Sequence, residues 1–189
     1  PRLRYVFDVS DTGELPNKSR SPNLWELSGR HIPPVTFMLE QEYGVAEAPL
    51  YEQLIQLAEN LADEYWQDHE DEILEAMDSS LYDELDALTI ETEFTATLSS
   101  SIAYTLCNRC GLDVDQIFDA EYFPHLYNFN TMQAVACLGT ATSALAEPVL
   151  MEIGRTIKRI ERGLVAEQER SNEHEPNHLQ AERLSLIHI

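Results

Sequence analysis

Two cysteines near the middle of the chain have the spacing of a zinc knuckle or of a redox pair. Cys107 and Cys110 are separated by two residues, and Cys137 lies further along the chain. A structural zinc site needs four ligands, and a redox pair needs a strand-to-helix turn that lowers the pKa of one thiol. The sequence shows no fourth zinc ligand, because no histidine is suitably spaced beside Cys137. It also shows no such strand-to-helix turn. We therefore expect Cys107 and Cys110 to pack as small apolar side chains at a helix C-terminus.

A second motif begins like that of a zinc metallopeptidase. His69 and Glu70 are followed by Asp71, Glu72 and Ile73, whereas the motif requires two histidines one helical turn apart. Because Ile73 occupies the position of the second histidine, we expect an acidic helix face in water rather than a zinc site.

A pair of carboxylates near the start of the chain could face a cation. Asp8 and Asp11 precede Gly13, but two carboxylates fall short of the about six to eight oxygens that calcium prefers, so a turn is favoured. The sequence also contains no glycine-rich phosphate loop and no Gly-x-Ser-x-Gly motif. We predict no catalytic, cofactor-binding or metal-binding residue, no cofactor, and a chain that is not an enzyme.

The charge of the chain is strongly negative. Twelve Lys and Arg stand against 34 Asp and Glu, a net charge of −22. No Lys or Arg occurs in the 78 residues between Arg30 and Arg109, which carry 18 Asp or Glu. Such a balance disfavours direct binding to nucleic acid or to anionic lipid. The acidic tract either keeps the domain soluble, or it imitates the charge of DNA and docks on a basic partner.

Four cations near the end of the chain break this pattern. Arg155, Lys158, Arg159 and Arg162 lie within about two helical turns and share one side of a predicted helix. We expect them to pair with the acidic helices of the same chain, since such pairing needs no partner.

The elements that position these residues are predicted to be mainly helices, after a short N-terminal β element. Arg2–Val9 alternates as a strand does and ends in turn residues, and Trp25 is expected to plug the core. Apolar spacing and helix-end signals predict the helices. The second is expected to bend near Asp68, the fourth to end at Gly111, the fifth to begin in a capping box, and the sixth to open at Pro148. The predicted helices cover residues 33–44, 50–77, 79–88, 94–110, 130–143 and 148–164.

The chain divides into three parts by composition. Residues 1–166 are expected to form one helical domain that is truncated at its N-terminus, because the chain begins without Met. Residues 167–183 are expected to be a polar linker. Residues 184–189 match what CTG TCT CTT ATA CAC ATC, a transposon end used in sequencing libraries, would encode, and are expected to be adaptor. Since the sequence shows no signal peptide and no apolar run of about 20 residues, we expect a cytoplasmic protein without a membrane contact.

Five segments carry a family resemblance in their order and spacing over about residues 3–165. The segments are Leu3–Thr12, Ser21–Trp25, Leu61–Trp66, Tyr104–Leu112 and Phe129–Val135. Together they resemble the LtrC-like, ArdC-related domain of very large proteins carried by bacterial conjugative elements and phages, proteins that often carry helicase and methylase domains. Related antirestriction proteins join a single-stranded-DNA-binding domain to a zinc-peptidase-like domain with the two-histidine motif, which this chain lacks.

This resemblance implies a non-catalytic accessory domain of a mobile-element DNA-processing or antirestriction protein, with the other domains of that protein as partners. An acidic DNA mimic that binds a restriction enzyme or another basic DNA-binding protein is the alternative. A metal-dependent hydrolase is the third and least favoured interpretation.

Overall fold

The computed structural model describes residues 25–118, 122–123 and 125–174. This part of the chain is mainly helical, as predicted, and contains no strand. The strand expected at Arg2–Val9 and the turn at Asp8 and Asp11 lie outside the described residues.

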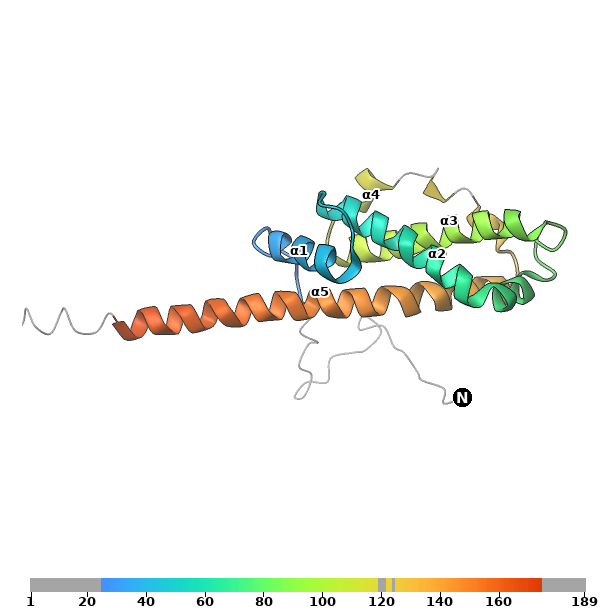
Figure 1. Ribbon diagram of the computed structural model, residues 1–189. Coiled ribbons are helices and arrows are strands. Elements are labelled where there is room, and N and C mark those ends of the chain that lie inside the picture. The colour runs from blue at the N-terminus through green and yellow to red at the C-terminus, as the bar shows by residue number, and fades with distance from the viewer. Residues whose placement is uncertain (1–24, 119–121, 124, 175–189) are drawn as a thin grey trace, which may run out of the picture.

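Four helices form a bundle around one core (Figure 1). The second and third helices lie side by side, the last helix runs along both, and the first helix packs against the second and the last. The last helix continues past the end of the bundle (Figure 1). In chain order the elements are α1 (Ile32–Tyr43), α2 (Leu50–Met77), α3 (Ala87–Arg109), α4 (Val114–Ile117), the 3-10 turn η3 (Leu126–Asn128) and α5 (Met132–His174).

The first two helices confirm their predictions. Prolines occupy the first turn of α1, where a missing N–H costs nothing, and Gly44 ends the helix with a φ of 67°. Helix α2 is interrupted at His69, whose φ of −131° is not helical. The Nδ1 atom of His69 lies 3.1 Å from the carbonyl oxygen of Tyr65. The interruption lies one residue from the bend expected near Asp68 and confirms it.

The prediction of a short helix over residues 79–88 is wrong. This segment forms turns, and α3 begins at Ala87 behind Asp86, whose side chain accepts a hydrogen bond from the N–H of Thr89 at 3.0 Å. The Ser80 hydroxyl donates to the Met77 carbonyl and accepts from the N–H of Tyr82. A serine hydroxyl can bond the nearby backbone in a turn as well as in a helix cap. The serines at the start of this segment therefore predicted a helix where the chain forms turns.

Helix α5 is continuous, so the predicted break before Pro148 is also wrong. Pro148 lies inside the helix. It leaves the carbonyl of Ala144 without its helical donor, at an exposed position where water can replace the bond. Ala146 before the proline is buried, and so are Val149 and Ile153 after it. These residues hold both halves of the helix against the bundle. Packing therefore overrides the local preference of proline.

Both ends of α5 differ from the prediction. The helix cap is Thr131, whose hydroxyl accepts from the N–H of Ala134, and not Asn130. Asn130 instead accepts from the N–H of Leu81 at 3.0 Å, and the Gln133 amide donates to the Glu75 carbonyl at 3.4 Å. At the other end the helix runs to His174, so the first part of the predicted linker at 167–183 is helical. A helix that has already formed extends cheaply through Glu, Gln and Arg.

The core lies where α2, α3 and α5 meet. The four-residue spacing predicted for α3 is confirmed, because Phe94, Leu98, Ile102 and Leu106 are all buried. Phe94 contacts Trp66 of α2, with ring centroids 5.9 Å apart. The face that α5 buries includes Ala134, Leu138, Ala141, Val149, Ile153 and Ile157.

Candidate functional site

Helix α2 presents an acidic surface, which we call the α2 acidic face. All of its nine carboxylate side chains are exposed, and the helix carries no Lys or Arg. Within the described part of the chain, none of them lies within 4.0 Å of a Lys or Arg nitrogen. No Lys or Arg of the described residues therefore neutralises the charge of this face. Its residues are Glu52, Glu59, Asp63, Glu64, Asp68, Glu70, Asp71, Glu72 and Glu75.

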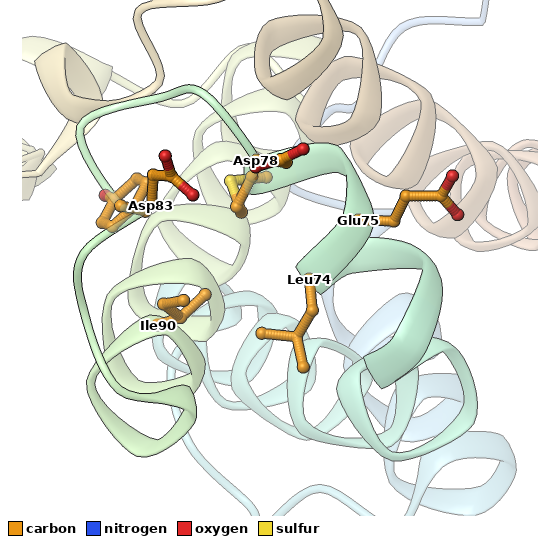
Figure 2. A pocket seen from close by; sticks show the side chains of 7 residues that line it. Leu74, Glu75, Asp78, Asp83 and Ile90 are labelled. Atoms are coloured by element: carbon orange, nitrogen blue, oxygen red, sulfur yellow. The ribbon is translucent and has the colours of Figure 1, made fainter.

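A small hollow lies at the C-terminal end of this face, where α2 turns toward α3 (Figure 2). Its volume is about 240 Å³. Leu74 and Ile90 line its apolar side, Asp78 and Asp83 line the opposite rim, and Glu75 points away from it (Figure 2). Such a hollow can take a side chain with an aliphatic stem and a positive end, as Arg and Lys have.

The carboxylates at the hollow do not make a metal site. No group of three or more His, Cys, Asp or Glu side chains in the described ranges is arranged to hold a metal ion. The Ile73 side chain, at the position of the missing second histidine, is buried in the core. The His69 ring stacks on Tyr65, with centroids 4.1 Å apart, beside exposed carboxylates.

Beside the hollow, a polar cluster joins residues that are far apart in sequence. Glu93 of α3 accepts from the Asn128 amide at 3.1 Å, and its carboxylate lies 3.4 Å from Nδ1 of His125. The Tyr82 hydroxyl donates to the His125 carbonyl at 3.3 Å. Burial, with the nearby Glu93 charge, raises the pKa of Tyr82 well above its usual value. The phenol stays neutral and ties the segment around η3 to the α2–α3 connection.

Sequence reasoning missed this cluster, because no motif spacing links Glu93 to His125. A histidine held by a carboxylate can act as a general base, but it needs a nucleophile or a bound water and a cavity beside it. The Tyr82 hydroxyl is engaged with a backbone carbonyl. The geometry therefore favours a structural role for the cluster.

The first two cysteines of the chain pack as small apolar side chains at a helix C-terminus, as expected. Cys107 and Cys110 are buried at the end of α3. Gly111 follows with a φ of 72°, and the N–H of Leu112 donates to the Cys107 carbonyl, which closes the helix. Burial raises the pKa of Cys107 to about 12 and that of Cys110 to about 11. Such thiols are poor nucleophiles and poor metal ligands at neutral pH.

The cations of α5 do not pair with the acidic helices, contrary to the prediction. Arg155 pairs with Glu152 on its own helix at 2.7 Å. Lys158, Arg159 and Arg162 are exposed and make no ion pair with any described residue. Helix α5 meets α2 beside its C-terminal turn, where Gln133 contacts Glu75, and that contact is more than twenty residues before the cations.

The cation at the end of the acidic tract has a structural role. The Arg109 guanidinium lies 3.8 Å from the centroid of the Trp25 ring, and two of its nitrogens donate to the Trp25 carbonyl at 3.1 Å. Trp25 is half-buried and packs on the core, in agreement with its prediction.

Comparison with known proteins returned no match: no family model, no curated protein and no solved structure matches this chain.

Proposed function

We propose that this chain is a non-catalytic accessory domain of a large mobile-element DNA-processing or antirestriction protein, and that it docks on a basic surface. The resemblance of its motifs to LtrC-like and ArdC-related domains supports the class of protein. The α2 acidic face supports the mode of action, and it is the observation that carries the proposal. Its partner is another domain of the parent protein in the cytoplasm.

The chemistry of the face favours protein over a small molecule. Exposed carboxylates without cations attract a positive surface over long range and give it an orientation. The hollow at Leu74 and Ile90 adds an apolar floor beside Asp78 and Asp83, so a basic side chain gains both burial and an ion pair there. An accessory role needs nothing more from this chain than such a surface.

A peptide of alternating Arg and Leu is the probe for this proposal. Titrated into the ¹⁵N-labelled chain, it is expected to shift the amide signals around Leu74, Tyr82 and Ile90 most strongly. Asp78→Asn with Asp83→Asn is expected to remove those shifts. Glu42→Gln with Glu47→Gln, an equal change of charge at exposed positions outside α2, is the matched control and should keep them. Shifts spread evenly over α1 and α5 would contradict docking at this face.

The exposed and unpaired state of all nine α2 carboxylates also favours the alternative, an acidic DNA mimic. A mimic competes with DNA for a restriction endonuclease, and the competition weakens steeply with salt because ion pairs are screened within about 8 Å at physiological ionic strength. The set Asp63→Asn, Asp68→Asn, Glu72→Gln and Glu75→Gln would abolish it. An accessory domain leaves the binding of DNA to the endonuclease unchanged with or without these substitutions.

A further inference from the structure

Helix α5 leaves an apolar side uncovered by any described element. Its stretch within Met132–Val165 is long and apolar enough to cross a membrane by length and composition, yet only 28% of it is buried. This corrects the expectation that no apolar run approaches such a length, because the helix does not break before Pro148. Met132, Val135 and Met151 are 86%, 53% and 47% exposed. Glu147 is the one charged residue between Met132 and Met151, and it is exposed on this side of the helix, one turn from both Ser143 and Met151.

The middle of this side is made of small residues, which let another helix approach closely. Gly139 and Ser143 lie one turn apart and are exposed, between Val135 on one side and Met151 on the other. A Cβ atom added at Gly139 would meet no atom within 4 Å. The backbone of α5 is therefore open to solvent here. We call the surface from Met132 to Met151 the α5 apolar face.

The two ends of α5 lie in opposite charge environments. Near its N-terminal end, Gln133 of α5 contacts Glu75 in the last turn of α2, and Asn130, just before α5, contacts Leu81 in the α2–α3 connection. That connection exposes a group of carboxylates, whereas the other end of α5 carries a group of Lys and Arg side chains. The carboxylates are Glu75 at the end of α2 and Asp78, Asp83, Glu84 and Asp86 after it, and the cations are Arg155, Lys158, Arg159 and Arg162, interspersed with Glu152 and Glu161.

We propose that the α5 apolar face binds a second copy of this chain, with the two α5 helices antiparallel. In that orientation the cationic end of each helix lies at the acidic end of the other, whereas a parallel pair would bring like charges together. Centred between Gly139 and Ser143, the pair also brings Met132 of one copy near Met151 of the other. The contact is the same on both copies, so it closes as a two-fold dimer.

The first test measures the mass of the whole chain by light scattering and sedimentation equilibrium. The expected value is twice the monomer mass of 21.5 kDa. Gly139→Arg places a charge on the face and should weaken dimerisation by more than about tenfold. Gly163→Arg is the matched control, because its Cβ also has open space on the same helix, and it should stay dimeric. Circular dichroism checks that both variants remain helical.

The second test measures the orientation by disulfide cross-linking in a Cys137→Ser background. Met132→Cys chains mixed with Met151→Cys chains should cross-link, and neither chain should do so alone. A parallel pair would cross-link each variant with itself and would contradict the proposal. Arg159→Glu with Arg162→Glu should weaken the dimer, and high salt should weaken it too.

Other occupants of the face give different results. A lipid bilayer would leave the chain monomeric in water and make it float with phosphatidylcholine vesicles, with binding lost in Gly139→Arg. A cover formed by residues 1–24 of the same chain would leave it monomeric at every concentration and make Gly139→Arg unstable. A dimer that Gly139→Arg leaves intact would place the contact elsewhere. Each of these results would overturn the proposal.

Discussion

Single side chains decide how the α2–α3 connection folds. Tyr82 is 1% exposed, its ring packs edge-on against Phe129 with centroids 5.1 Å apart, and its hydroxyl reaches the backbone of His125. These contacts cross more than forty residues of chain, so no local pattern contains them. Ser79, at the start of the segment expected to be helical, has a φ of 62°, which a non-glycine residue adopts rarely and at some cost. The tertiary anchoring of Tyr82 offsets that cost.

The three thiols provide a prediction at this scale. Cys107 and Cys110 are buried and Cys137 is half-buried, so in the native chain iodoacetamide should modify Cys137 first. Mass spectrometry of the alkylated peptides measures the order. Equal modification of all three thiols under native conditions would contradict the burial of the pair.

The same burial makes stability depend on pH. The native thiols hold their protons more tightly than the ordinary pKa of 9.0, up to about 12 for Cys107 and about 11 for Cys110. Their contribution to the free energy of unfolding is full below pH 9 and is lost as pH rises through that window. Urea unfolding from pH 8 to 11 should show the decline, and Cys107→Ala with Cys110→Ala should make it shallower.

At the scale of elements, local signals predicted what local forces control. The ends of α1 and α3 follow from Gly44 and Gly111, whose positive φ an L side chain would resist. The length of α2 follows from its unbroken apolar spacing. The continuity of α5 through Pro148 could not be predicted, because it depends on contacts with α2 and α3 on both sides of the proline.

The candidate site was predictable in part for the same reason. Counting carboxylates between Arg30 and Arg109 found the acidic tract, since charge is a property of composition. The hollow and the Glu93–His125 pair required the arrangement of α2, α3 and η3. The expected pairing of Arg155 with the acidic helices failed because sequence spacing gives no distance between helices.

Two glycines of α5 test the packing of the helix. A Cβ atom at Gly154 would lie 2.6 Å from Nε1 of Trp25, whereas one at Gly163 meets nothing. Gly154→Ala should therefore displace Trp25 and lower the free energy of unfolding by about 1–3 kcal/mol. Gly163→Ala should raise it by about 0.5–1 kcal/mol, because alanine favours a helix. Urea denaturation followed by circular dichroism measures both, and a stabilising Gly154→Ala would contradict the Trp25 contact.

At the scale of the whole molecule, charge is segregated rather than balanced. The acidic face lies on α2, and the uncompensated cations lie on the far part of α5. Repulsion among the α2 carboxylates opposes folding. The separation of negative from positive charge gives the molecule an electric dipole moment. The segregation of charge therefore has a cost in stability.

Salt should therefore stabilise the monomer. In the Gly139→Arg chain, raising NaCl from about 0.01 M to about 0.1 M shortens the Debye length from about 30 Å to about 10 Å and should raise the melting temperature. The fourfold neutralised chain, Asp63→Asn with Asp68→Asn, Glu72→Gln and Glu75→Gln, should melt higher at low salt and respond less. Differential scanning calorimetry at several salt concentrations measures both, and a melting temperature that falls with salt would refute self-repulsion.

The part of α5 beyond the bundle has a mechanical consequence. Ile157 is the last buried residue of α5 among those whose side chains the structure describes, and the helix continues to His174, roughly 26 Å further along its axis at 1.5 Å per residue. A sideways force applied at His174 exerts a torque on the bundle. The helix would turn about a point near Ile157 and the Trp25–Gly154 contact. Tension along the axis would shear α5 past α2 and α3, whereas a sideways load would peel α5 away from its overhanging end.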